Sequence, residues 1–351
     1  MISQLLACAA ILVIMLLISC PFYLSLLVSG AFLTIVINGI PASTVISGFG
    51  EGVYKISLVA VPFYMLAGSV MQHTSIGRRL IDAIMPMVSH MRGGVALTGV
   101  LSNEVFGAMS GSSPAAVGTI GRVMMPMVIE ENGEKTAYGL FASAGSLAII
   151  MPPSINMIIF GAATNTSTGA LFIGGIIPSI LITVMLAIYI ISISKKKKNV
   201  RFDMSKMLKG LYQGVCALAL PVIILGGIYT GIFTPTEAGV VSAVYVILAA
   251  IFLGEMSWKV LFLSLKESVM LTSQIFILIA ASTVFSQGLA LTGIPKYLAS
   301  VMGGLSPIVF LVILNIILLI AGCFFEPGSA IIILAPVLVP IGTALGLNPV
   351  H

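Results

Sequence analysis

Residues Ser110-Gly111-Ser112-Ser113-Pro114 interrupt an apolar stretch that runs from Val95 to Val128. A lipid bilayer offers no water to unpaired backbone groups, so such a break is stable at that depth only where it faces protein or a wet cavity. Pro114 suits the first turn of a new helix, whose free N–H groups would point into the break. The five residues are therefore candidates for a binding site.

A second break follows at Met151-Pro152-Pro153-Ser154-Ile155-Asn156, inside the apolar stretch from Ala137 to Ala163. Paired broken helices in a membrane protein indicate the binding site of a secondary transporter. The simpler interpretation is two ordinary loops between short helices, and it is disfavoured because both breaks lack charges and have strongly apolar flanks. We expect the two breaks to contact each other near the middle of the membrane.

The composition is that of an all-α polytopic membrane protein. Hydrophobic residues make up 59% of the 351 residues, charged residues make up 8%, and the mean hydropathy is +1.18; several runs are long enough to span a bilayer. The net charge of +5 does not indicate nucleic-acid binding, because 7 of the 16 Lys and Arg lie in one cluster between Lys195 and Lys209. Such a cluster is typical of a cytoplasmic loop.

The apolar runs predict membrane spans at 1–19, 21–39, 53–74, 137–161 and 170–194, and further spans near 215–233, 237–253 and 261–285. Residues 75–92 place arginines among apolar residues at helical spacing, which predicts an amphipathic arm along the membrane surface. Acidic residues between 129 and 136 predict a polar loop.

The stretch 93–128 has two possible topologies. It either crosses the membrane, or it enters and returns as a re-entrant hairpin with Ser110–Pro114 at its tip. If the basic loop at 196–210 is cytoplasmic, only the hairpin also places the arginines of the 75–92 arm inside. In this topology 12 of the 16 Lys and Arg are cytoplasmic, and only Lys55 and Lys296 lie at the outer side.

An internal repeat relates the two halves of the chain at offsets of 213 to 216 residues, as in the pairs Pro21/Pro235, Glu51/Glu267, Pro114/Pro327 and Pro126/Pro340. We assign residues 1–195 to the first repeat and 211–351 to the second, which has its own hairpin at 305–345. The first repeat has five crossings, an odd number, so the second is inverted in the membrane, as in many secondary transporters. The mirror of 137–195 is absent from this sequence. Either about 60 to 75 residues are missing or the repeat is naturally incomplete, and we expect the former.

The breaks contain the oxygen ligands that sodium prefers. Hydroxyls of Ser110, Ser112 and Ser154, together with backbone carbonyls at helix ends, would bind sodium, and a substrate would contact the remaining break residues. Close helix packing is the competing interpretation for Gly111 and Ser112. At the tip of the second hairpin, Glu326-Pro327-Gly328, the carboxylate either binds a ligand or caps the helix that begins at Pro327. Glu237 follows Thr234 at the spacing of a capping box.

Four motifs resemble the large membrane subunit (M subunit) of the tripartite ATP-independent periplasmic (TRAP) transporters: Ser110-Gly-Ser-Ser-Pro114, Ile150-Met-Pro-Pro-Ser-Ile155, Phe233-Thr-Pro-Thr-Glu-Ala-Gly239 and Glu326-Pro-Gly328. The resemblance covers essentially the whole chain. Members of the family usually continue beyond a motif similar to Asn348-Pro-Val-His351 into a second broken helix, so we expect this sequence to lack the family's C-terminal part.

The resemblance implies a sodium-driven importer of a small organic acid, such as a C4-dicarboxylate or sialic acid, in the bacterial inner membrane. It implies inverted repeats with two opposed hairpins that move as an elevator against a scaffold. It also implies two protein partners, a small four-helix membrane subunit and a periplasmic substrate-binding protein.

Enzymatic motifs are missing from the sequence. It contains no His-Glu-x-x-His, no Gly-x-Ser-x-Gly and no Gly-rich phosphate loop with its lysine, so we expect no catalysis and no cofactor beyond coupling sodium ions. The alternatives that remain are a divalent-anion/sodium symporter working without a binding protein, an ion channel, and an inactive scaffold subunit. The sequence does not specify the transported acid.

Overall fold

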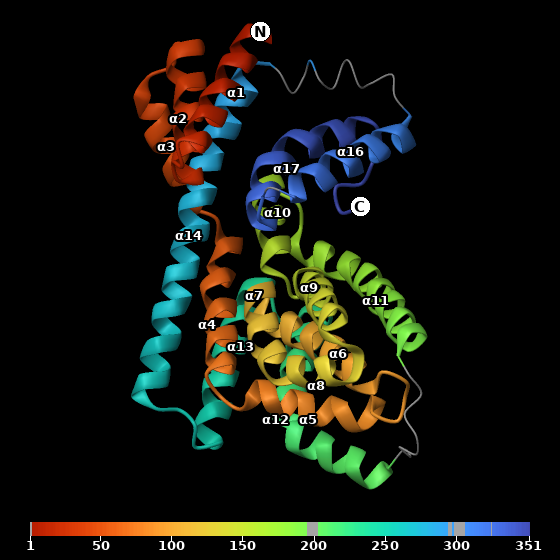
Figure 1. Ribbon diagram of the computed structural model, residues 1–351. Helices are drawn as coiled ribbons and strands as arrows, with labels where there is room; N and C mark the ends of the chain where they lie inside the picture. The colour runs from red at the N-terminus through yellow and green to blue at the C-terminus, as the bar shows by residue number, and fades with distance from the viewer. Residues whose placement is uncertain (1, 195–202, 294–296, 298–305, 324) are drawn as a thin grey trace. The chain divides into compact units, whose positions relative to one another are not determined.

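The computed structural model describes residues 2–194, 203–293, 297, 306–323 and 325–351, and these residues form helices and no strands. By length and composition, five of the described helices can cross a membrane, or seven if each of two bent helix pairs counts as one span. The expected all-α polytopic membrane architecture is confirmed (Figure 1). Most of the basic cluster, 195–202, lies outside the described residues.

The chain divides into two compact units that interleave along the sequence. Unit 1 comprises residues 1–58, 159–167 and 272–351, and unit 2 comprises residues 59–158 and 168–271. The borders at 58/59 and 271/272 are 213 residues apart, which is the period of the predicted repeat. Each unit therefore contains residues from both halves of the chain. Two helices, α10 (Ile155–Thr164) and α14 (Trp258–Leu291), run from one unit into the other.

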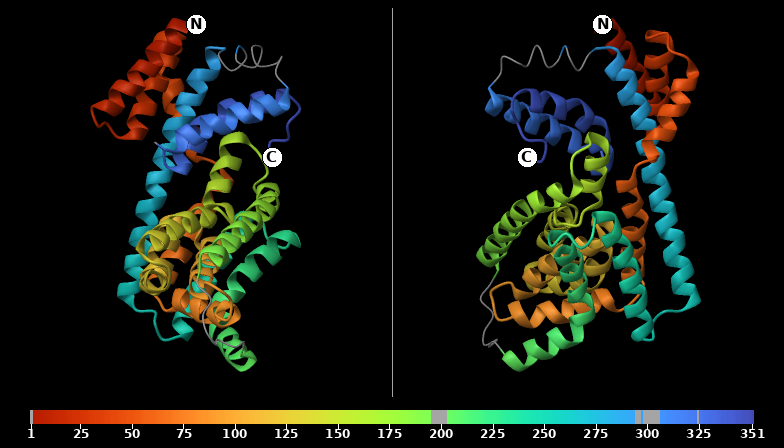
Figure 2. Two further views of the ribbon diagram at one scale, coloured as in Figure 1. Left: turned by 45° about the vertical axis from the view of Figure 1, so that its right-hand side comes forward. Right: turned by 180° about the vertical axis from the view of Figure 1, so that it is seen from behind.

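Unit 1 combines the N-terminal helices with the end of α14 and a C-terminal helix pair. Its complete helices are α1 (Ile2–Leu17), α2 (Phe22–Ala31), a continuing π-helix (Phe32–Ile37), α3 (Ala42–Val53), α16 (Pro307–Gly322) and α17 (Pro327–Ala344). Figure 2 shows α1 to α3 beside the end of α14. A Cβ atom on Gly30 would come within 2.6 Å of the Phe285 backbone, so α2 and α14 touch at their backbones.

The hydrophobic pattern does not predict α3, because its residues include three glycines and glycine is a poor helix former. Two of them serve close packing instead. A Cβ atom on Gly48 would come within 2.2 Å of Gln287 Oε1, and one on Gly52 within 2.7 Å of Thr283 Oγ1. Contact with α14 therefore stabilises a helix that local propensity disfavours.

Unit 2 holds the first hairpin and the helices around it. They are α4 (Ala60–Gln72), α5 (Ile76–Val88), α6 (Gly94–Ser110), α7 (Ser113–Ala116), a π-helix (Val117–Gly121), α8 (Arg122–Asn132), α9 (Glu134–Ile150), α11 (Thr168–Ile193), α12 (Met204–Tyr229) and α13 (Pro235–Phe252). α5 is the predicted amphipathic arm. Its apolar side is buried, and Gly210 of α12 lies so close that a Cβ atom there would be 2.7 Å from the Asp82 carbonyl.

The stretch 93–128 folds as a hairpin. α6 packs against α8 as well as α7, which requires the chain to reverse at the break rather than continue straight on. The hairpin is longer than expected, and the predicted polar loop at 129–136 is wrong. Its glutamates continue α8 and begin α9, since Glu is a good helix former, and the turn is made by Gly133 alone at φ +85°.

Two further differences concern the predicted spans. The span expected at 261–285 is the middle of α14, whose 34 residues extend about 51 Å, more than the ~30 Å of a hydrocarbon core. The predicted basic loop at 196–210 ends early, because α12 already begins at Met204 with Asp203 as its N-cap. The capping box at α13 is confirmed: the Thr234 N–H donates to Glu237 Oε2 at 2.8 Å.

Candidate functional site

The first break joins two helix ends. α6 ends at Ser110. Its C-cap, Gly111, has left-handed backbone angles (φ +62°), and the Gly111 N–H donates to the Gly107 carbonyl at 2.6 Å. α7 begins directly afterwards with Ser112 as N-cap, since the Ser112 hydroxyl accepts a hydrogen bond from the Ala115 N–H at 3.4 Å. Pro114 stands in the first turn, as predicted. The break thus presents the C-terminal carbonyls of one helix and the N-terminal N–H groups of the next.

The second break separates α9 from α10, and the two helices are bent by 47° at this point. Ser154 is completely buried, and its hydroxyl donates to the Ile149 carbonyl at the end of α9. A hydroxyl that donates keeps its oxygen lone pairs, so the Ser154 oxygen can still accept a hydrogen bond or bind a cation. Met151 points elsewhere: its sulfur accepts a hydrogen bond from the Ser179 hydroxyl of α11 at 3.1 Å.

The two breaks meet. A Cβ atom on Gly111 would lie 2.8 Å from Ile155 Cγ1 and 3.0 Å from the Ile155 backbone nitrogen, so the end of α6 touches the start of α10. Nearby, a Cβ atom on Gly145 of α9 would lie 2.8 Å from Ser113 Oγ. The predicted contact between the breaks is therefore confirmed, and small residues make it possible.

The break residues differ in how they use their side chains. Ser110 is buried at 1% exposure, packs against Gly68 of α4, and accepts a hydrogen bond from the Ser112 N–H at 3.4 Å. Gly111 combines a positive φ with a close contact, and the contact agrees with the packing interpretation. Ser112 and Ser113 remain half-buried. A binding role for these side chains, and for Pro152, Pro153 and Asn156, stays a prediction.

The tip of the second hairpin belongs to unit 1. α16 packs against α17, and Glu326 is the N-cap of α17, where its carboxylate accepts a hydrogen bond from the Ser329 N–H at 3.2 Å. Pro327 is in the first turn, Gly328 is buried, and Glu326 itself is exposed. The capping interpretation of Glu326 is confirmed, and ligand binding by this carboxylate stays a prediction.

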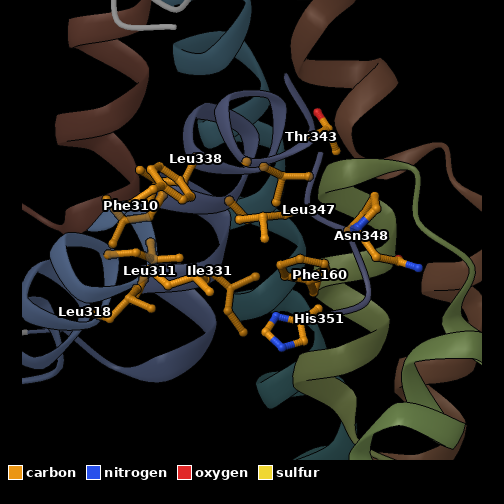
Figure 3. Close-up of a pocket in the computed structure, with 17 residues that line it drawn as sticks. Phe160, Phe310, Leu311, Leu318, Ile331, Leu338, Thr343, Leu347, Asn348 and His351 are labelled. Carbon is orange, nitrogen blue, oxygen red and sulfur yellow. The ribbon is translucent and has the colours of Figure 1, made fainter. Parts of the chain in front are cut away.

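Unit 1 also contains an apolar pocket of about 280 Å³ between α16, α17 and the last residues of the chain. Figure 3 shows Phe310, Leu311 and Leu338 among its lining residues, with Phe160 and His351 close together at one end. Its walls are almost entirely hydrocarbon. A carboxylate would find few hydrogen-bond donors there, so this pocket does not replace the breaks as the candidate site.

Three polar residues in the middle of α6 were not among the predicted site residues: Ser102, Asn103 and Glu104. All three are buried, and both polar atoms of the Asn103 side chain lack a hydrogen-bond partner among the described residues. Glu104 faces Thr183 of α11. Their polarity could have identified them in the sequence, because polar residues within an apolar run are functional candidates by default.

Glu267, which the repeat pairs with Glu51, is the centre of a second polar cluster. Its Oε2 accepts hydrogen bonds from the Ser69 hydroxyl at 2.5 Å and from the His73 ring at 2.9 Å, and so links α14 to α4. Glu267 is 198 positions from Ser69 and 194 positions from His73 in the sequence. Only the folded chain identifies them as one cluster.

Residues 9–351 match the family model described as "Tripartite ATP-independent periplasmic transporter, DctM component". The chain is 41% identical over 303 residues to the C4-dicarboxylate TRAP transporter large permease protein of Pseudomonas aeruginosa, covering 84% of this chain and 71% of that protein. It is 33% identical over 311 residues to the sialic acid TRAP transporter large permease protein of Vibrio cholerae, covering 86% and 72%. It is 32% identical over 315 residues to the ectoine/5-hydroxyectoine TRAP transporter large permease protein of Ruegeria pomeroyi, covering 88% and 73%.

Proposed function

Because this chain belongs to the DctM component family of TRAP transporters, and is an integral membrane protein of that transporter family rather than an enzyme, we propose that it couples the import of a small organic acid to sodium. The contact between the first and second breaks carries the proposal. Four helix ends converge there, and no Lys, Arg, Asp or Glu occurs in either break sequence.

The chemistry of the breaks suits a cation and a carboxylate bound side by side. Carbonyls at the ends of α6 and α9 favour a cation, and the N–H groups at the start of the following helices favour an anion. Hydroxyl oxygens at Ser110, Ser112 and Ser154 would complete the sodium ligands. Each bound species then stabilises the other, and a typical coupling of 1 to 3 kcal/mol corresponds to roughly a 5- to 150-fold change in affinity.

We expect a C4-dicarboxylate or a related acid as substrate, because the relative from Pseudomonas aeruginosa carries that name. A tripartite transporter contains two further proteins, and we expect them to be a small four-helix membrane subunit and a periplasmic substrate-binding protein. A divalent-anion/sodium symporter would need no binding protein.

The test is uptake of labelled succinate into proteoliposomes that contain this chain and its membrane partner. Accumulation that requires both an inward sodium gradient and added binding protein supports the proposal. Accumulation that follows a proton gradient and ignores sodium rejects sodium coupling. Uptake without a binding protein favours the symporter, and conduction without saturation favours a channel.

The elevator movement has its own test. The test uses a chain in which the native cysteines are replaced and Ser112→Cys is introduced. With sodium alone, a membrane-impermeant maleimide should react with the introduced thiol from one side of the membrane. When the transport direction is reversed, the reaction should occur from the other side. Labelling from the same side under every condition would reject movement of the first hairpin across the membrane.

A further inference from the structure

Lys55 occupies an unusual position in unit 1. It follows the end of α3, its side chain is half-buried, and its ammonium group donates to the backbone carbonyl of Ala162 in α10. Among the described residues of unit 1 it is the only Lys or Arg. Burial of part of an ammonium group among apolar side chains costs free energy unless the group is paired, so Lys55 is a candidate functional residue.

The charge of Lys55 has no counter-ion among the described residues of unit 1. No carboxylate there lies within 4.0 Å of its ammonium group. Glu51 is one helical turn earlier, but its carboxylate accepts a hydrogen bond from Gln287 Nε2 at 3.2 Å. An ammonium group carries three N–H donors, and the Ala162 carbonyl takes one, so two donors remain for a ligand.

A polar face of α14 completes the site. Ser282, Thr283, Ser286 and Gln287 follow the spacing of one helix face, and together with Lys55 they line a cavity of about 90 Å³. The remaining wall is apolar and comes from α10, α17 and Ile279 of α14. The hydroxyls of Ser282 and Thr283 donate to the Ile279 carbonyl at 3.2 and 2.9 Å. The donors left for a ligand therefore belong to Lys55, Ser286 and Gln287.

The cavity has room for at least one carboxylate group, since about 10 to 15 Å³ of such space already holds a water molecule. One positive charge and several donors around such a volume match a single carboxylate better than a neutral group or a cation.

We propose that this cavity binds one carboxylate of the transported acid, with Lys55 as its charge partner. The proposal rests on the proposed function for the identity of the acid, but not for the presence of an anion site. Lys55 then distinguishes organic anions from neutral molecules of the same shape, because a neutral molecule would leave the ammonium group unpaired.

The first experiment measures binding without transport. In a chain whose native cysteines are replaced and which still folds, the Ser286→Cys thiol is alkylated by a small methanethiosulfonate reagent. Succinate and acetate should slow this reaction at constant sodium, while chloride at equal ionic strength and the neutral diamide succinamide should not. Adding Lys55→Gln should abolish the protection, and Lys259→Gln, which removes an exposed charge of α14, should leave it intact.

The second experiment measures succinate uptake by variants of the complete transporter. Lys55→Gln should raise the apparent KM for succinate roughly 10- to 100-fold, Lys55→Arg should retain most of the affinity, and Lys259→Gln should behave like the wild type. An unchanged KM in Lys55→Gln, equal protection by chloride, or no protection by any carboxylate would overturn the proposal. Protection in a chain that transports no acid with sodium would instead uphold the anion site and reject the proposed function.

Discussion

Replacing Gly111 by alanine tests whether the two breaks are in contact. The left-handed backbone at φ +62° costs a residue with a Cβ atom about 1 to 2 kcal/mol. The new Cβ atom would also lie 2.8 Å from Ile155 Cγ1 and 3.0 Å from the Ile155 nitrogen, and such overpacking costs about 1 to 3 kcal/mol. We therefore expect Gly111→Ala to lower the free energy of unfolding by about 2 to 5 kcal/mol.

The matched control is Gly254→Ala. Gly254 also has a positive φ, +70°, but a Cβ atom there would meet nothing within 4 Å. Gly254→Ala should therefore lower the free energy of unfolding only by the backbone strain, about 1 to 2 kcal/mol. Unfolding by SDS in mixed micelles gives both free energies, and sodium-dependent uptake should fall in Gly111→Ala alone. Equal losses in the two variants would show that the end of α6 does not press on α10.

A double mutant locates the contact. Ile155→Ala removes a buried side chain and destabilises the protein by itself. It also removes the atom closest to the new Cβ. The double mutant Gly111→Ala/Ile155→Ala should therefore be more stable than the sum of the two single losses predicts, by about 0.5 to 3 kcal/mol. Strict additivity would refute the contact.

Three further outcomes are expected. Ser112→Ala should lower the apparent affinities for sodium and substrate together while the protein stays folded, and a sodium curve identical to the wild type would remove Ser112 from the site. Glu237→Ala should lower the free energy of unfolding by about 1 kcal/mol through loss of the capping box and leave the sodium dependence of uptake unchanged. Lys197→Cys, which lies outside the described residues, should react with an impermeant reagent only from the cytoplasmic side, and labelling in intact cells would overturn the topology.

The parts of the fold that sequence could predict are those decided within a few residues. Pro114 and Ser112 mark a helix start because a proline ring and a hydroxyl satisfy the first turn locally. The same holds for Thr234 with Glu237, and for Glu326 before Pro327. The predicted membrane character depends only on the length and apolarity of the runs.

The parts that sequence could not predict depend on distant residues. α3 is stabilised by the contact of Gly48 with Gln287, and glycine in a sequence indicates weak helix propensity rather than a packing surface. The prediction of a polar loop at 129–136 was wrong for a different reason. Acidic residues indicate exposure to solvent, and an exposed helix end has the same composition as a loop.

For this protein, the sequence alone determined the class, the two breaks and the helix starts at Pro114, Thr234 and Glu326, because these follow from hydrophobicity and from hydrogen bonds between near neighbours. The tertiary structure decided which breaks touch, and which polar side chains become partners. Glu267 meets Ser69 and His73, and Lys55 shares a cavity with Gln287, across about 200 residues or more of chain. Close packing of helices brings these residues together. That packing depends on backbone contacts, which the sequence of a single helix does not predict.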